Sequence, residues 1–154
     1  MYRKILVPVD GSELSECSLD EVGRVAGEQS EVLLLRVVEP AFSLASDASA
    51  AGFVPEKIQR QFEARNRAEA GEYVELLADR LKKKGVKARA KTVAGAPAAE
   101  VIKSASEEGA DLIIITTHGR SGISRWALGS VADKVLRTSR IPVLLVTPSG
   151  CRLK

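Results

Sequence analysis

Aromatic residues, cysteines and long apolar runs are scarce in this chain of 154 residues, and each scarcity excludes a class of protein. Aromatics make up 4% of the residues, so the core must be aliphatic. The longest apolar runs, such as 112–115 and 143–146, hold about four residues, whereas a membrane-spanning helix needs roughly 20. No membrane partner is therefore predicted.

The two cysteines, Cys17 and Cys151, lie far apart, and neither belongs to a C-x-x-C pair. Neither a disulfide framework nor a zinc site is therefore predicted. The apolar stretch near the N-terminus ends at Pro8, which makes it too short for the core of a signal peptide. Together these features predict a protein of the reducing cytoplasm.

Charge is close to balance, with 23 Lys and Arg against 20 Asp and Glu and a net charge of +3. That excess is too small to imply a nucleic-acid partner. Seven basic residues fall between positions 80 and 91, namely Arg80, Lys82, Lys83, Lys84, Lys87, Arg89 and Lys91. No aromatic side chains stand among them to stack on bases. We interpret this cluster as a solvated helix end followed by a protected edge strand, and predict no nucleic-acid binding.

Short apolar runs alternate with longer amphipathic stretches along the chain, which indicates strands alternating with helices. The predicted strands are 3–9, 32–38, 86–93, 111–116 and 141–147. The predicted helices are 12–28, 55–84, a third that opens at Pro97, and 129–139. The last of these is expected to turn Val135 and Leu136 towards the core. The segment 39–54 is rich in Ala and Ser, which predicts a long mobile connection. The segment 117–128 is predicted to be a loop.

This alternation predicts an α/β fold, a single open doubly wound sheet of five parallel strands with helices on both faces. The third strand, 86–93, carries a cation at every second position, which places it at one edge. The fifth, 141–147, contains Pro142, which a central strand tolerates badly, so we place it at the other edge. Its run 143–146 is apolar and unprotected, so a partner chain is expected to cover it.

In such a sheet, ligands bind beyond the carboxyl ends of the central strands, where the strand order reverses. The segments 8–12 and 116–119 follow the first and fourth strands, so both should reach this crevice. Asp10 has two compatible interpretations here, a cap for the following helix and a ligand contact.

The segment from Thr116 to Ser130 has the chemistry of a phosphate-binding loop. Gly119 and Gly129 let the backbone approach an anion closely, and Arg120 adds positive charge. Gly129 and Ser130 stand at the predicted start of a helix, whose free N–H groups favour phosphate. The chain has neither a Walker A loop nor the G-x-G-x-x-G dinucleotide fingerprint. Read alone, Gly129-Ser130 could be an ordinary loop-to-helix turn, and the spacing from Gly119 favours the phosphate site.

With these residues the chain resembles the nucleotide-binding branch of the universal stress protein family. The family motif, G-x2-G-x9-G-S/T, matches Gly119, nine intervening residues and Gly129-Ser130, while Thr116 stands where the motif has its first Gly. The opening 4–12 and the segment 141–146 also match, so the resemblance predicts a universal stress protein domain over 1–148 and a C-terminal tail over 149–154.

The resemblance implies strand order 3-2-1-4-5 in an adenine nucleotide alpha-hydrolase-like fold and a homodimer through the fifth strand, 141–147. It also implies ATP as ligand, with Mg²⁺ or Mn²⁺ on its phosphates and no confident metal ligand from the protein. By the same resemblance, the nucleotide-binding residues are Pro8, Val9, Asp10, Val37, Thr116, Gly119, Arg120, Gly129, Ser130 and Val131.

The sequence shows no general base, activated nucleophile or lysine placed on phosphates, so we expect a cytoplasmic stress-response or signalling module with at most slow ATP hydrolysis. His118, the one histidine, is interpreted as a polar loop residue. Two alternatives stay open. One is an enzyme of the related alpha-hydrolase type, although 10–13 is a poor version of its pyrophosphate loop. The other is a stress-protein homodimer that binds no ATP, or that binds another adenosine nucleotide such as cyclic AMP.

Overall fold

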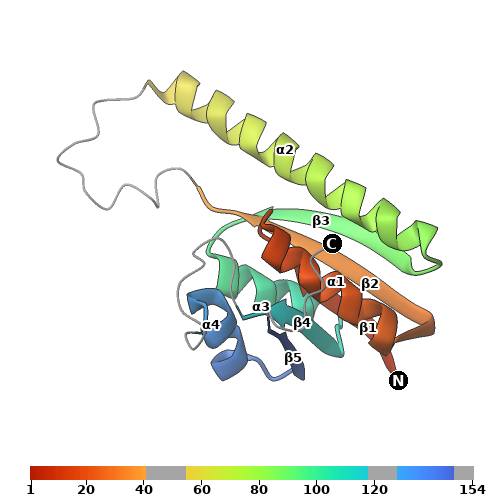
Figure 1. Ribbon diagram of the computed structural model, residues 1–154. Coiled ribbons are helices and arrows are strands. Elements are labelled where there is room, and N and C mark those ends of the chain that lie inside the picture. Colours follow the sequence, from red (N-terminus) through yellow and green to blue (C-terminus); the bar gives the residue numbers. More distant parts are fainter. Residues whose placement is uncertain (41–54, 118–127, 148–154) are drawn as a thin grey trace.

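The computed structural model describes residues 1–40, 55–117 and 128–147, and these form one five-stranded parallel sheet with four helices (Figure 1). The strand order is β3-β2-β1-β4-β5, as the sequence analysis predicts. The strands are β1 (Tyr2–Pro8), β2 (Ala26–Val38), β3 (Lys87–Ala94), β4 (Leu112–Thr116) and β5 (Val143–Val146). The helices are α1 (Glu13–Val25), α2 (Glu56–Lys83), α3 (Pro97–Glu107) and α4 (Ser130–Thr138).

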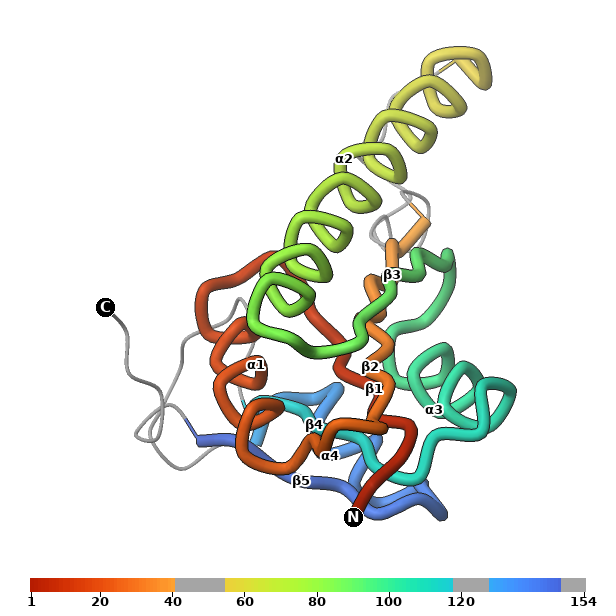
Figure 2. Tube along the Cα trace, turned by 90° about the vertical axis from the view of Figure 1, so that its right-hand side faces the viewer, coloured from red at the N-terminus to blue at the C-terminus, as the bar shows by residue number. Residues whose placement is uncertain are grey.

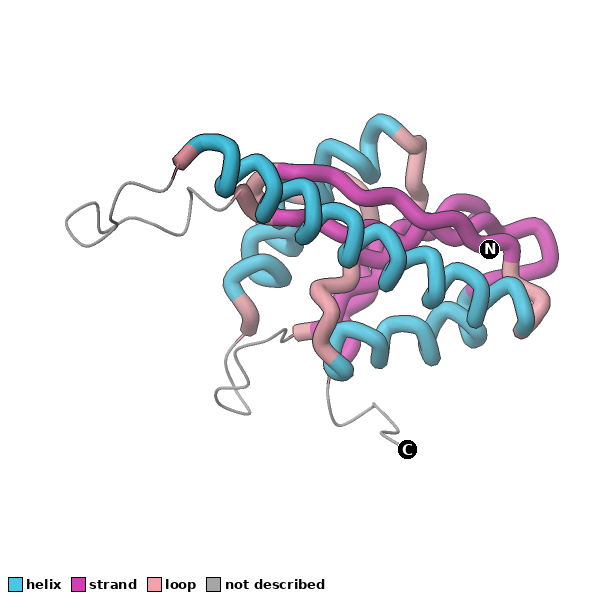
Figure 3. Tube along the Cα trace, turned by 90° about the horizontal axis from the view of Figure 1, so that it is seen from above, coloured by secondary structure: helices cyan, strands magenta, loops and turns pink. Residues whose placement is uncertain are grey.

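Two apolar clusters lie on the two faces of the sheet, because successive side chains of a strand point to opposite faces. Ile5 and Val7 of β1 pack with α1 and α2, whereas Leu6 between them packs with α3 and α4. The sheet is therefore covered on both faces. Seen from above, α2 lies along the strands (Figure 3). None of the helices in the described part of the chain is long and apolar enough to cross a membrane.

The first helix begins as predicted but ends early. Ser12 is its N-cap, and the Ser12 Oγ accepts a hydrogen bond of 3.1 Å from the backbone N–H of Ser15. The helix ends at Val25 rather than at residue 28, because Ala26 is already extended and pairs with Tyr2. The predicted strand 32–38 is thus the second half of a longer β2.

Two predictions for the last helix and the last strand of the chain, α4 and β5, need correction. The fifth strand begins at Val143 rather than at residue 141, because Pro142 has no N–H for the ladder; its carbonyl still accepts a hydrogen bond from Ile113 N at 2.9 Å. Leu136 of α4, expected to face the core, is 45% exposed.

Cys17 is the one cysteine in the described part of the chain, and it is buried on α1. The other cysteine, Cys151, lies outside the described residues, so the prediction that the chain has no disulfide framework stays a prediction.

Helix α2 divides into two halves. The later half buries one face against the sheet, through Ala70, Val74, Leu77, Ala78 and Leu81. The earlier half extends beyond the sheet (Figure 2), and its apolar residues Ile58 and Phe62 are 54% and 55% exposed. Only the later half is therefore held by the core.

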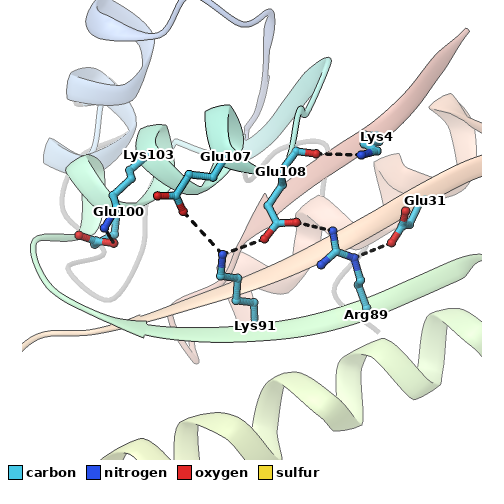
Figure 4. A network of polar contacts seen from close by, with 8 residues as sticks. All are labelled: Lys4, Glu31, Arg89, Lys91, Glu100, Lys103, Glu107 and Glu108. Atoms are coloured by element: carbon cyan, nitrogen blue, oxygen red, sulfur yellow. Dashed lines mark hydrogen bonds and ion pairs between the residues drawn. The ribbon is translucent and has the colours of Figure 1, made fainter.

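The cations of edge strand β3 are not simply solvated. Arg89 contacts Glu31 of β2 at 2.5 Å and Glu108 at 2.6 Å, and Lys91 contacts the other oxygen of Glu108 at 2.8 Å (Figure 4). Lys4 of β1 donates to the backbone carbonyl of Glu108 at 3.0 Å. Glu108, just after α3, thus ties together three strands, and its hydrogen bonds from Lys91 and Arg89 lower its carboxyl pKa to about 2.

Glu108→Gln is expected to cost about 1 kcal/mol of unfolding free energy at pH 7, the upper range for a solvent-accessible ion pair. The folded pKa lies below the unfolded one, so this stabilisation is present above about pH 4.5 and is lost as the pH falls towards 2. Urea unfolding at pH 7 and pH 3 measures the difference between parent and variant, which should shrink at the lower pH.

Glu107→Gln is the matched control, because Glu107 is more exposed and reaches Lys91 only at 3.9 Å. It should change stability little at either pH. A cost for Glu108→Gln that stays the same at both pH values would contradict the assignment.

Candidate functional site

A cavity of about 640 Å³ lies at the carboxyl ends of β1, β2 and β4, within the size range of small-molecule sites. Its walls come from four places: the strand ends with the turn after β1, one face of α2, Pro97 and Val101 of α3, and the N-terminus of α4. The cavity thus lies at the crevice predicted from the strand order.

Eight of the ten residues predicted to bind nucleotide line this cavity: Pro8, Val9, Asp10, Val37, Thr116, Gly129, Ser130 and Val131. The other two, Gly119 and Arg120, lie outside the described residues, as does His118. Residues from three strands and one helix are thus brought together, and their role as ligand contacts stays a prediction.

The turn after β1 holds the Asp10 carboxylate in a defined place. Asp10 Oδ1 accepts hydrogen bonds from the Ser12 backbone N–H at 2.9 Å and from Ser12 Oγ at 2.5 Å. Gly11 between them has φ of +85°, which favours glycine. Since Ser12 is the helix cap, Asp10 is not needed for that task and orders the turn at the edge of the cavity.

The strand ends form an apolar floor. The Val9 N–H donates to the Leu35 carbonyl at 2.9 Å, and Pro8 is the last residue of β1 in register with β2, opposite Leu35. Residues 36–38 therefore extend beyond β1. Val37, in this extension, borders the cavity with Val9 and Ile115 and can pack against a flat apolar group.

The N-terminus of α4 supplies hydrogen-bond donors. Gly129 is its N-cap, no side chain caps it, and the first N–H groups of a helix have no intrahelical acceptor. The Gly129 N–H donates to the Thr117 carbonyl at 2.5 Å, and the Thr117 N–H donates to Val146 O at 2.9 Å, so this end is anchored to β4 and β5. With no Cβ at Gly129, the opening of α4 can accept an anion closely.

The wall made by α2 is not predicted from the sequence. Asn66, Glu69, Ala70 and Tyr73 line the cavity and share one helical face, three or four residues apart. The sequence does contain a signal for this wall. The apolar stripe of the helix begins at Ala70, and one turn earlier the same face carries the polar residue Asn66 instead of a core residue.

Tyr73 links this wall to α1. Its hydroxyl donates to Glu16 Oε1 at 3.0 Å, and Arg80 Nη1 donates to Glu16 Oε2 at 2.9 Å. Burial first, and then the hydrogen bond to the Glu16 carboxylate, raise the pKa of the Tyr73 phenol. Tyr73 therefore remains protonated throughout the physiological range.

Within the described residues, no group of three or more His, Cys, Asp or Glu side chains could hold a metal ion. The cavity does fit an anionic ligand at the N-terminus of α4, because the first N–H groups of that helix are available as donors. A divalent ion here would have to take most of its oxygen ligands from that anion.

The model of the universal stress protein family matches residues 1–147. The chain belongs to the universal stress protein family. The fold of this universal stress protein, with strand order 3-2-1-4-5, agrees with the assignment and confirms the resemblance seen in the sequence.

Three related proteins match this chain over nearly their whole length. Universal stress protein YxiE of Bacillus subtilis is 34% identical over 147 residues, which is 95% of this chain and 99% of YxiE. The structure of MJ0577 from Methanocaldococcus jannaschii is 32% identical, with a TM-score of 0.82 and 96% of each chain covered. A universal stress protein in complex with cyclic AMP is 26% identical, with a TM-score of 0.60, covering 95% of this chain and 97% of that one.

Proposed function

We propose that this universal stress protein binds an adenine nucleotide in the cavity at the strand ends, with ATP as the leading ligand. The observation that carries the proposal is that an uncapped helix N-terminus and an apolar floor border one cavity of about 640 Å³. The phosphates would lie at Gly129, Ser130 and Val131, and the base against Val37.

The metal in this proposal, Mg²⁺ or Mn²⁺, would neutralise the phosphate charge. The residues present fit such an ion when it is bound to the nucleotide. The carboxylate of Asp10, which lines the cavity, could add one oxygen ligand to those of the phosphates. The chain itself would contribute orientation and hydrogen-bond donors.

We propose a binding module, a stress-response or signalling protein of the cytoplasm, rather than a fast enzyme. In the part of the cavity that the structure describes, no lysine lines the wall, and Arg36 donates to the Val9 carbonyl at 3.4 Å. Any ATP hydrolysis should therefore be slow. The second candidate ligand is cyclic AMP, which a 26% identical relative binds.

Native mass spectrometry of the protein purified without added nucleotide tests the proposal, followed by titration with ATP and Mg²⁺ and with cyclic AMP. Copurified ATP, or an ATP Kd well below that of cyclic AMP, would support the leading ligand. The reverse order would favour the second candidate. Binding of neither would overturn the proposal.

Thr116→Gly should tighten ATP binding, because Thr116 lines the cavity where the family motif has a glycine. The side chain is 9% exposed, so removing it also weakens β4, and binding and unfolding must be measured separately. Thr116→Ser, which removes only the methyl group, should give part of the gain, at most about fourfold for one group of this size. Equal or weaker affinity of both variants in a titration would mean that Thr116 does not crowd the site.

We also propose that the protein forms a homodimer through β5. This strand is an edge of the sheet, and Val143, Leu144 and Leu145 are only half-buried. Apolar residues along an unpaired edge call for a covering surface, and a two-fold dimer covers both edges at once.

Val143→Lys is therefore expected to give folded monomers in light scattering. Val146→Lys, at the buried end of the same strand, should lower stability instead. A parent protein that is monomeric at micromolar concentration would contradict the dimer.

A further inference from the structure

The wall that α2 contributes to the cavity offers hydrogen bonds to a neutral polar group. Three of its four lining residues are polar: Asn66, Glu69 and Tyr73. Glu69 pairs with Arg65 at 2.8 Å, one turn earlier on the same helix. Among the described residues, the amide of Asn66 makes no hydrogen bond, so both its donor and its acceptor are available to a ligand.

Tyr73 is held in place and can still accept a hydrogen bond. Its proton is donated to Glu16 at 3.0 Å, and Glu16 is held in turn by Arg80 at 2.9 Å. A phenol oxygen that donates its one proton keeps lone pairs for another donor. Tyr73 therefore presents a positioned acceptor, on the same helical face as Asn66.

The other walls of the cavity suit the phosphates and the base of a nucleotide, so the sugar is the part that remains for α2. The N-terminus of α4 attracts phosphate, whereas the carboxylates of Asp10 and Glu69 repel it. The apolar residues Val9 and Val37 suit a base rather than hydroxyl groups. The sugar, which joins base and phosphates, is the part that carries neutral hydroxyls and needs partners of this kind.

We infer that α2 forms the sugar-recognition wall of this cavity, in which Asn66 and Tyr73 hydrogen-bond the ribose hydroxyls. The site consequently prefers ribonucleotides to deoxyribonucleotides. This inference rests on the proposed function, since it concerns the sugar of the nucleotide bound there. Asn66 and Tyr73 are specificity-determining residues, and the α4 contacts supply the phosphate affinity.

Calorimetric titration with ATP, 2′-deoxy-ATP and 3′-deoxy-ATP, each with Mg²⁺, tests the inference. The parent protein should bind ATP roughly tenfold more tightly than at least one deoxy analogue, the effect of one lost hydrogen bond. Asn66→Ala and Tyr73→Phe should each weaken ATP binding by roughly five- to tenfold and leave the affinity for that analogue nearly unchanged. The ratio between the two ligands should therefore fall towards one.

The chain contains matched controls for both substitutions. Gln61→Ala removes an amide from the exposed first half of α2, and Tyr2→Phe removes a phenol hydroxyl at the opposite end of β1, and neither residue lines the cavity. Both controls should keep the parent ratio.

The possible failures are distinct. Equal binding of ATP and both deoxy analogues by the parent would overturn the sugar wall and leave the nucleotide site standing. The same conclusion follows if Asn66→Ala and Tyr73→Phe both keep the full ratio. If the parent binds none of the three nucleotides, the proposed function and this inference are both overturned.

Discussion

Gly129→Val should abolish the stabilisation of this protein by ATP and Mg²⁺. A ligand that binds only the folded state at 100 times its Kd stabilises it by about 2.7 kcal/mol, which corresponds to a rise in Tm of roughly 5–10 °C for a domain of this size. The isopropyl group of valine would block the approach of phosphate to the N-terminus of α4. The shift for the variant should be less than about 1 °C under the same conditions.

The fold should survive this substitution. Gly129 has φ of −60° and ψ of 145°, an extended conformation that valine adopts readily. Gly23→Val is the matched control, because Gly23 lies on α1, and a Cβ there meets nothing within 4 Å. Scanning calorimetry with and without nucleotide measures both variants. A full shift in Gly129→Val would mean that the phosphates bind elsewhere.

Leu77→Ala should cost about 3 kcal/mol of unfolding free energy, whereas Leu76→Ala should cost less than about 0.5 kcal/mol. The two leucines are neighbours on α2, so replacing either one by alanine changes the helical propensity by nearly the same amount. Leu77 is 0% exposed in the cluster shared by α1, α2 and the sheet, and Leu76 is 56% exposed. The difference therefore measures the packing that holds α2 to the sheet.

Urea unfolding at pH 7 gives both values. If the two variants lose similar amounts of stability, α2 does not dock on the sheet through the face containing Val74, Leu77 and Leu81.

The architecture could be predicted because several local signals agree. Alternating residues of the strands separate into two apolar clusters. The cations of β3 lie on one edge strand, and Pro142 directly precedes the other edge strand, β5. Most of the site could also be placed from topology, because the carboxyl ends of parallel strands share one edge of the sheet. Asp10, Thr116 and Gly129 meet there although they are far apart in sequence.

The missed features depend on contacts between distant parts of the chain. Val25 and Ala26 continue the apolar spacing of α1, and only pairing of Ala26 with Tyr2 turns the chain into β2. Leu136 has the spacing of a core residue, but α4 is short and turns it outward. The cavity wall on α2 follows from where that helix crosses the sheet, which helical periodicity alone does not determine.

The unequal anchoring of α2 gives the helix the geometry of a lever. Its 28 residues make a rod of about 42 Å at 1.5 Å per residue. The docked half acts as the fulcrum, and Asn66 and Tyr73 lie close to it, whereas Ile58 and Phe62 lie far out on the free arm. A tilt of about 10° around Ala70 would carry the first turn through roughly 3–4 Å at that rise per residue. A small adjustment of the cavity wall would therefore be magnified at the exposed apolar end of the helix.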